Sequence, residues 1–506
     1  LVEVSGKEEL YFDGSVDTTA ANGKTGTLLL DPDTITIADG SGTTTASGAS
    51  TFTTIYEDTL EAVSSTTNIT LLATSSISLS DLSDNLLNLQ QGSGNSVTFT
   101  VTAGTISFAS STDTISTNGG DITFSATGDL TIGSLTSNGG NISLTGDDFS
   151  LSGTLSSGAG NISITHADSG KIGIGGTSCT GSCDLSINTT ELGNMSGNKL
   201  IIGGSTNGDI YVDGITQTTS TFSNGVELNV DAHLSGSKGA IIFEGSASSF
   251  STLDASAVDG VEVNANLTTT TGALTLDGDS DNAVDTLSGN DYIIFASGIT
   301  LTSAGNISLS ATNGGMTAAG ALTLSATSGL TMTGAMTGAG AVALTANSGI
   351  TLNSSVSTSS GSLNINANSS ALSLGSVTLS SAGALTLSSS SISSSGNLAL
   401  TSTGSTISVG SAVTSSGSVA MTASSGLTLS NSTLTGSGSV SLEGGSALTL
   451  ASGTTITSSA GSITLGASTG SITANGALTL SSNGSITVSN TMTTAGAATF
   501  NANSGI

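Results

Sequence analysis

Basic residues are almost absent from this chain of 506 residues. It has no arginine, and its basic side chains are Lys7, Lys24, Lys171, Lys199 and Lys238. Against these five lysines stand 35 acidic residues, so the formal net charge is −30 at pH 7. Binding to nucleic acid or to an anionic lipid surface depends on many Lys and Arg side chains that meet phosphate groups. The composition therefore excludes nucleic acid as a partner and disfavours direct binding to an anionic membrane.

Residues that fill the cores and helices of ordinary globular domains are also scarce. The chain has no tryptophan, 4 tyrosines, 11 phenylalanines and a single proline, Pro32, and only 8% of its residues are charged. Glycine, serine and threonine dominate, together with small aliphatic residues. Disordered linkers can share such a composition. Here, however, apolar residues alternate with polar ones, which is typical of β-strands and has no reason to persist in a linker.

A repeat of about 20 residues is clearest in the segment 118–163. Each unit has an apolar pair at spacing two, a second such pair and then a single apolar residue, with Gly, Asn, Asp and Ser between them. Spacing two places both side chains on one face of a strand, and the small polar residues suit tight turns. One unit is therefore three short strands, which can bury their apolar faces only by stacking on neighbouring units. The leading pairs are Ile122/Phe124, Ile142/Leu144 and Ile162/Ile164.

These features predict an all-β fold, a right-handed parallel β-helix (β-solenoid) with about three short strands in each coil of about 20–23 residues. A single helical turn is expected at Asp58–Val63. The first strands are expected at Thr34–Ile37, Asn68–Leu72, Ile77–Leu79, Val97–Val101 and Thr105–Phe108.

The repeat is most regular in residues 301–506, which contain a single acid, Glu443. Most leading apolar residues follow one another at the length of one coil, but some steps are clearly shorter. The chain distance from Ile307 to Leu385 is the same as that from Leu385 to Ile463, and each span contains four steps. We expect each short step to be a narrower coil, or a coil that lacks one side, where the solenoid bends or twists. The leading residues are Ile307, Leu322, Val342, Leu363, Leu385, Leu398, Val419, Val440, Ile463 and Leu478.

Four regions follow from these patterns. Residues 1–110 form an irregular β segment that leads into the solenoid, and 111–164 are regular coils of about 20 residues. Residues 165–300 are irregular coils with longer acidic loops, and 301–506 are regular Ser/Thr/Gly-rich coils with the super-repeat of four steps. The last six residues, NANSGI, copy TANSGI at 345–350 in all but the first letter. We therefore expect the chain to stop inside a repeat of a longer protein.

Two blocks near the start resemble a known family. The two blocks are GTLLLDPDTITI (26–37) and TLEAVSSTTNITLLATSSISLSDLSDNLL (59–87). Together with the strand repeats that follow, they are similar to the filamentous haemagglutinin/haemolysin-type exoproteins of two-partner secretion. The resemblance implies a right-handed parallel β-helix that is exported through an outer-membrane pore and acts at the bacterial cell surface in adhesion or aggregation. The family's secretion domain, with its Asn-Pro-Asn motifs, is absent from this sequence. The outer-membrane secretion pore is therefore an expected partner of the parent protein.

The two cysteines, Cys179 and Cys183, lie in the loop GGTSCTGSCDLS. Their close spacing permits a small disulfide, and an extracellular chain with two cysteines favours that interpretation. A metal pair is the alternative, although the next candidate ligand, His166, lies outside this loop. The sequence therefore predicts a disulfide that staples a loop.

One acidic loop has a pattern typical of calcium ligands. Asp277, Asp279 and Asp281 alternate in DGDSDN, with Asp285 beyond them. The twelfth position is Ser288 and not glutamate, which excludes an EF-hand. An acidic, solvated corner is the favoured interpretation, and a looser calcium site at the three aspartates is the alternative. No other cofactor is expected.

Enzymatic function is not expected. A catalytic histidine needs an orienting partner and a nucleophile, and serine is too abundant here for a Ser/His/Asp set around His166 or His233 to be informative. A glycan hydrolase needs two carboxylates that face each other. Acids in the irregular region could supply them, but charges and aromatic sugar platforms are scarce elsewhere. These acids are Glu227, Asp231, Glu244 and Glu262.

The sequence thus predicts a non-enzymatic segment of an extracellular, rod-like adhesin that mediates cell adhesion, aggregation or biofilm formation. Its expected partners are a host or neighbouring cell surface, or other copies of itself, and its expected location is the bacterial cell surface outside the outer membrane. Weak contacts repeated along a solenoid would sum to avidity. The alternative is a structural subunit of an extracellular filament or sheath, because nearly uncharged coils oppose lateral packing only weakly.

Overall fold

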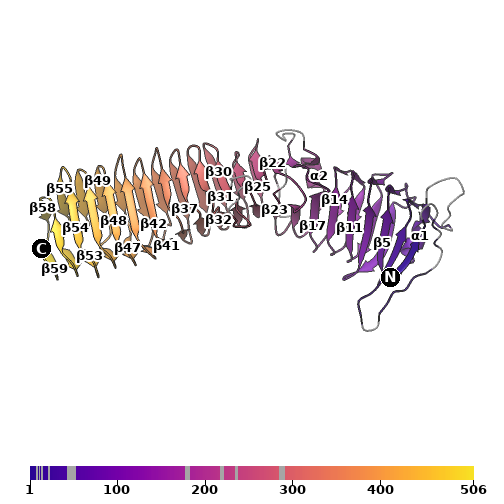
Figure 1. The fold of residues 1–506 in the computed structure, drawn as a ribbon, viewed down its shortest axis with the longest axis horizontal. Coiled ribbons are helices and arrows are strands. Elements are labelled where there is room, and N and C mark those ends of the chain that lie inside the picture. The colour runs from indigo at the N-terminus through magenta and orange to yellow at the C-terminus, as the bar shows by residue number, and fades with distance from the viewer. Residues whose placement is uncertain are drawn as a thin grey trace. The chain divides into compact units, whose positions relative to one another are not determined.

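The computed structural model describes residues 1–6, 10, 12, 15–20, 23–42, 53–176, 183–216, 221–233, 238–283 and 291–506. The chain forms two compact units, Leu1–Val258 (unit 1) and Asp259–Ile506 (unit 2). In each unit short strands stack side by side in parallel, coil upon coil, as Figure 1 shows. Each unit is therefore a parallel β-solenoid, which confirms the predicted all-β class.

Unit 1 is built mainly from three parallel sheets. The first contains β1 (Val2–Ser5), β2 (Thr27–Asp31), β5 (Asn68–Ala73), β8 (Ser96–Val101), β11 (Asp121–Ala126), β14 (Ile142–Gly146), β17 (Ile162–His166), β21 (Leu200–Gly204), β23 (Val226–Val230) and β26 (Leu253–Ala257). The second contains β4 (Thr53–Tyr56), β3 (Thr34–Ala38), β6 (Ser76–Leu79), β9 (Thr105–Phe108), β12 (Leu130–Ile132) and β15 (Phe149–Leu151). The third contains β7 (Leu86–Gly92), β10 (Thr114–Asn118), β13 (Ser134–Thr136), β16 (Leu155–Ser156) and β20 (Met195–Ser196).

The later coils of unit 1 are less regular and add strands outside these three sheets. They are β18 (Ile172–Gly175), β19 (Leu185–Asn188), β22 (Ile210–Asp213), β24 (Ile241–Glu244) and β25 (Ser248–Phe250). The five strands predicted at the start of the chain correspond to β3, β5, β6, β8 and β9, so those predictions are confirmed.

Unit 2 has three sheets, one for each side of its coils. Sheet 1 contains β29 (Leu274–Asp277), β32 (Ile307–Ser310), β35 (Leu330–Thr333), β38 (Ile350–Leu352), β41 (Ala371–Leu374), β44 (Ser391–Ser394), β47 (Ala412–Ser415), β50 (Thr433–Gly436), β53 (Thr454–Ser458), β56 (Leu478–Ser482) and β59 (Ala498–Ala502). Sheet 2 contains β27 (Val261–Val263), β30 (Tyr292–Phe295), β33 (Gly315–Ala318), β36 (Met336–Gly338), β39 (Val356–Thr358), β42 (Val377–Ser381), β45 (Leu398–Ser402), β48 (Val419–Ala423), β51 (Val440–Gly444), β54 (Ile463–Ala467) and β57 (Ile486–Val488). Sheet 3 contains β28 (Leu267–Thr269), β31 (Ile299–Ser303), β34 (Leu322–Ala326), β37 (Val342–Ala346), β40 (Leu363–Asn366), β43 (Leu385–Ser388), β46 (Ile407–Val409), β49 (Gly426–Leu429), β52 (Ala447–Leu450), β55 (Ser471–Ala474) and β58 (Met492–Thr494).

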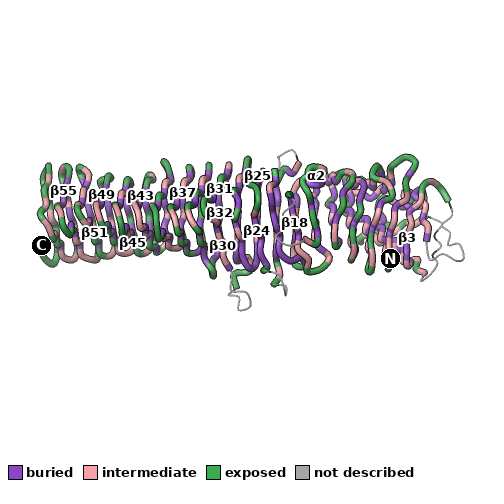
Figure 2. The backbone as a smooth tube through the Cα atoms, turned by 90° about the horizontal axis from the view of Figure 1, so that it is seen from above, coloured by how far each residue is buried: buried purple, intermediate pink, exposed green. Residues whose placement is uncertain are grey.

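The core consists of columns of like residues. In sheet 3, Leu324 pairs in register with Leu344, and Leu344 pairs with Ile365, and all three side chains are buried. The residues between them point outward, because successive side chains of a strand alternate between faces. Figure 2 shows buried positions along the strands and exposed positions at the turns. Each buried aliphatic side chain contributes roughly 1.5–3 kcal/mol relative to an exposed one.

The short steps of the sequence repeat are not narrower coils, and that expectation was wrong. Leu385 lies in sheet 3 and pairs with Leu363 and Ile407, whereas Leu398 lies in sheet 2 and pairs with Val377 and Val419. The short step from Leu385 to Leu398 therefore covers two sides of a coil, past β44 on sheet 1, whereas a full coil covers three. The other short steps do the same, from Ile307 in sheet 1 to Leu322 in sheet 3 and from Ile463 in sheet 2 to Leu478 in sheet 1. After each short step, the leading apolar pair therefore lies on a different sheet than before. Every coil nevertheless keeps three sides.

Buried hydroxyl groups hold the corners of successive coils together. In unit 1 the hydroxyl of Thr117 donates to the carbonyl oxygens of Gly120, in the same corner at 2.6 Å, and of Ser137, one coil on at 3.2 Å. The hydroxyl of Ser157 repeats this with Gly160 (2.7 Å) and Ser196 (3.5 Å). The hydroxyl of Ser157 thus adds a second hydrogen bond to carbonyl oxygens that already accept from backbone N–H groups, Gly160 from Asn198 and Ser196 from Ser157.

Two short helices interrupt the strands among the described residues. α1 (Glu57–Glu61) confirms the predicted helical turn. α2 (Thr189–Gly193) was not predicted. It begins with a capping box in which Asn188 accepts from the backbone N–H of Glu191, and the Glu191 side chain accepts from the N–H of Asn188. Within the described ranges, neither helix is long and apolar enough to cross a membrane.

Candidate functional site

One extensive candidate surface is a column of outward side chains on sheet 3 of unit 2, here called the sheet 3 column. Its members occupy equivalent positions in successive strands, and each is at least partly exposed. Most are threonine, and none is charged. The register places them as Thr300, Thr323, Ala343, Asn364, Thr386, Ser408, Thr428, Thr449, Thr473 and Thr493.

The column repeats one chemistry at a fixed spacing. Neighbouring strands of a sheet lie about 4.7–4.9 Å apart, so a small uncharged side chain, most often a threonine, recurs at about that interval along the sheet. Sheet 1 carries a comparable uncharged column that runs in register from Thr275 to Asn501. Unit 2 therefore presents long rows of small, uncharged side chains that are both hydrogen-bonding and weakly apolar.

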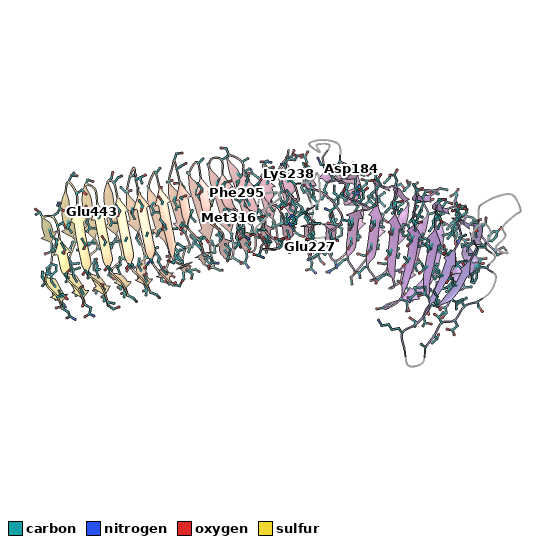
Figure 3. The ribbon with its side chains drawn as sticks, viewed as in Figure 1. Asp184, Glu227, Lys238, Phe295, Met316 and Glu443 are labelled. Carbon is teal, nitrogen blue, oxygen red and sulfur yellow. The ribbon has the colours of Figure 1, made fainter. Side chains whose placement is uncertain are left out.

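Sheet 2 differs because a carboxylate interrupts its outward row. Glu443 follows Thr401 and Thr422 in register, and Figure 3 labels it among coils that otherwise lack charge. Its Oε1 atom accepts a hydrogen bond from the hydroxyl of Ser468 at 2.7 Å. The sheet 3 column is therefore the longer uninterrupted surface of the two.

The aspartates of the candidate calcium loop hydrogen-bond mainly with their own backbone. Oδ1 of Asp277 accepts from the N–H of Asp279 (3.1 Å), and Oδ1 of Asp281 accepts from the N–H of Ala283 (2.9 Å). Asp279 is fully buried, and its Oδ2 accepts from the N–H of Asn313 at 2.8 Å. Burial, aided by the charge of Asp279, raises the pKa of Asp277. These contacts suit an acidic corner, and calcium binding there stays a prediction.

The cysteine loop is only partly described. Cys179 lies outside the described residues, so the predicted disulfide with Cys183 stays a prediction. Cys183 itself packs against a small buried cluster formed by Tyr211, Ala240 and Ile242. The nearby ammonium group of Lys171 lies 5.6 Å from the centre of the Tyr211 ring.

Among the acids of the irregular region, Glu227 is bound by two neighbouring side chains. Oε2 of Glu227 lies 2.6 Å from the ammonium nitrogen of Lys199, and Oε1 accepts from the Nδ2 group of Asn229 at 2.8 Å. Burial acts to raise the pKa of Glu227, but Lys199 and Asn229 outweigh it and hold that pKa below its usual value. Burial raises the pKa of Asp231, and the charge of Glu227 adds to this effect. Figure 3 labels Glu227 in this region.

Sequence reasoning missed an acidic group around α1. Glu57 and Asp113 are buried, and each has one carboxylate oxygen without a hydrogen-bond partner among the described residues. Burial raises the pKa of both, and the negative charges of Asp39 and Asp84 add to the effect. These residues are far apart in the sequence, and only the stacking of coils brings them together.

The structure also assembles a group that no local motif indicated, formed by Asp147, His166 and Asp168. His166 is fully buried at the end of β17, and its Nε2 lies 3.3 Å from Oδ1 of Asp147. Its Nδ1 lies 3.2 Å from Oδ1 of Asp168. A signal was present in the sequence, since the spacing between Asp147 and His166 is nearly one coil.

No protein-family model, no curated protein and no solved structure matches the chain. The fold and the surfaces described above are therefore the basis for any functional inference.

Proposed function

We propose that the chain is a segment of an extracellular, fibrous surface adhesin of the filamentous haemagglutinin type, which mediates cell adhesion, aggregation or biofilm formation. The observation that carries this proposal is the sheet 3 column. Its rows of threonine and other small side chains repeat along the solenoid without a charge, so a partner surface can form the same weak contact many times. Such contacts sum to avidity even when each one is weak.

The same surface favours contact with other copies or with a cell surface over small-molecule chemistry. The column is an array of positions on a sheet, where small, uncharged side chains recur coil after coil. A small ligand would need a pocket with a few convergent polar groups. Bacterial origin, secretion through an outer-membrane pore and location outside the outer membrane are part of this proposal.

The alternative is a structural subunit of an extracellular filament or sheath. The uncharged rows on sheets 1 and 3 favour it, because two such surfaces meet without electrostatic repulsion. The two functions differ in the partner, since the adhesin binds a different surface and the filament subunit binds only its own copies.

A bead assay tests the proposal with the full chain. Latex beads coated with the chain are mixed with washed erythrocytes and, separately, with one another. In the test variant, Thr323, Thr428, Thr449 and Thr473 of the sheet 3 column are replaced by Glu. The matched control replaces four threonines by Glu on sheet 2, whose outward row already contains Glu443. These threonines are Thr317, Thr337, Thr401 and Thr422.

We expect native beads to bind erythrocytes, the test variant to lose most of this binding, and the control to keep it. Clumping of beads with one another but no binding to erythrocytes would favour the filament function. Equal binding by all three proteins would overturn the role of the sheet 3 column. Circular dichroism first establishes that each variant is folded.

A further inference from the structure

We propose that Asp147, His166 and Asp168 form a binding site for one divalent transition-metal ion of the Zn²⁺ class. Among the residues that the structure describes, these three bring one potential ligand atom each within 4.8 Å of one another. The group belongs to unit 1 and plays no part in the proposed adhesive surface.

His166 is placed by the stacking of coils. In register it lies beside Gly146, the last residue of β14, and Asp147 follows directly. A Cβ atom at Gly146 would lie 2.8 Å from Cγ of Leu130, so the close packing of this coil requires a glycine beside His166. Gly170 closes over the ring, since a Cβ atom there would lie 2.2 Å from Nε2. The ring is thus held by packing, as a metal ligand must be.

The Nε2 atom of His166 is the observation that points to a ligand. The side chain is fully buried, and Nε2 has no hydrogen-bond partner in the described part of the chain. A buried polar atom without a partner is unusual in a folded protein and calls for an explanation. Nε2 lies 3.3 Å from Oδ1 of Asp147, a carboxylate that is about half exposed.

That distance fits a shared metal ion. In a tetrahedral zinc site, bonds to nitrogen and oxygen are about 2.0–2.2 Å, so two ligand atoms lie roughly 3.3–3.6 Å apart. A metal ion between Nε2 and Oδ1 would therefore need little movement of either residue. The Asp168 side chain is largely exposed and can supply the third protein ligand by rotating.

The other ring nitrogen of His166, Nδ1, already has hydrogen-bond partners in the backbone of Asp168. Nδ1 lies 3.2 Å from the backbone carbonyl oxygen of Asp168 and 3.1 Å from its N–H group. Without metal, Nδ1 accepts from that N–H, and the proton sits on Nε2. With metal on Nε2, the proton moves to Nδ1 and is donated to the carbonyl oxygen. Metal-binding histidines commonly donate their other N–H in this way.

The donor set selects the class of ion. Imidazole nitrogen suits Zn²⁺, Co²⁺, Ni²⁺ and Cu²⁺, whereas Ca²⁺ and Mg²⁺ prefer oxygen ligands alone. The site joins the turn after β14 to the end of β17 and the turn after it. Bound metal would therefore clamp two successive coils of unit 1.

The test uses the full chain after treatment with a chelator and dialysis. Co²⁺ is added while visible absorption is recorded, Zn²⁺ binding is measured by calorimetry, and ¹⁵N NMR follows the His166 ring nitrogens. The variants are His166→Gln, Asp147→Asn and Asp168→Asn. The matched controls are His233→Gln, at the other histidine, and Asp148→Asn, at the carboxylate next to Asp147, which instead accepts from the N–H of Ser186.

We expect one ion to bind per chain, with an intense tetrahedral Co²⁺ spectrum and a change of the His166 tautomer. His166→Gln should abolish binding, Asp147→Asn should weaken it by at least about tenfold, and Asp168→Asn should weaken it less. Both controls should bind like the native chain. The proposal is overturned if the native chain shows no 1:1 binding, or if Asp147→Asn, a half-exposed position that should fold normally, binds as tightly as Asp148→Asn.

Discussion

The ammonium nitrogen of Lys199 lies 2.6 Å from Oε2 of Glu227, one coil further along the chain. Both side chains are mostly buried, since 30% and 26% of their surfaces are exposed. The pair joins the turn before β21 to β23. Because the chain has only five basic residues, this contact gives one of its few cations a structural role.

Replacing Lys199 by Met should lower the stability of unit 1 at neutral pH by about 0.5–1 kcal/mol, after allowing for the partial exposure of the pair. The pKa of Glu227 is held below its ordinary value, so the pair stabilises the fold above that ordinary pKa. The contribution is lost as the pH falls through the lowered pKa. Thermal melting at pH 7 and at pH 3 checks this, with Lys24→Met as the control. An equal loss at both pH values would contradict it.

Truncation of a core leucine should be far more costly. Leu344 is fully buried between Leu324 and Ile365, so Leu344→Ala leaves a cavity in a column that cannot easily collapse. We expect a loss of about 2–5 kcal/mol. Hydrogen exchange of the neighbouring strands measures it locally, which suits a repeat fold. Thr323→Ala, on the outer face of the same sheet, is the control and should change little. Similar losses for the two variants would refute the inward assignment of Leu344.

The buried hydroxyl groups at the corners of unit 1 predict a third effect on stability. Ser157→Ala removes a donor to the carbonyl oxygens of Gly160 and Ser196 and leaves them without that partner. Because both carbonyl oxygens keep a backbone N–H donor, we expect a loss of about 0.5–1.5 kcal/mol, seen as faster hydrogen exchange in β16, β17 and β20. Ser156→Ala, at the neighbouring outward position, should cost much less. If the two serines prove equivalent, the hydroxyl groups do not hold the corners.

The buried acid Asp113 predicts a dependence of stability on pH with the opposite sign to that of Glu227. Burial raises its pKa, so the folded chain binds the proton more tightly than the unfolded chain does. The unfolding free energy is therefore highest below the ordinary pKa of Asp and falls as the pH rises through the raised value. Asp113→Asn can still accept from the N–H of Leu82 and should reduce this loss.

Melting curves from pH 3.5 to pH 8 provide the measurement. Asp113→Asn should gain stability relative to the native chain at pH 7 and match it at the acidic end. Asp129→Asn removes an exposed carboxylate from the same unit and serves as the control. A gain at pH 3.5 as large as that at pH 7 would show that the effect is not electrostatic.

Much of the fold could be predicted because its signal is local. Apolar pairs such as Leu322/Leu324 repeat at spacing two, and small polar residues mark the corners, so strands, coils and inward faces follow directly from the sequence. The prediction that each short step is a narrower coil failed for a physical reason. The three sides of a coil use the same apolar pattern, so nothing in Leu385 or Leu398 shows on which side each lies.

The side-chain groups were harder to predict because they depend on stacking. Asp147 and His166 lie together only because Gly146 and His166 share a register position in neighbouring strands. Stacking also brings Asp39 and Asp84 near both Glu57 and Asp113, whose local sequences contain no recognisable site pattern. In a solenoid, residues about one coil apart become neighbours, and a search at that spacing would have found the His166 group.

Electron cryo-microscopy of the full chain mixed with erythrocyte membranes tests the proposed adhesive function most directly. We expect separate single particles in solution and, on membranes, particles attached along the surface that carries the sheet 3 column. The variant with four glutamates on that column should remain unattached. Particles that do not attach to the membrane but assemble with one another into fibres of fixed repeat would contradict the adhesin function. They would identify the chain as a filament subunit.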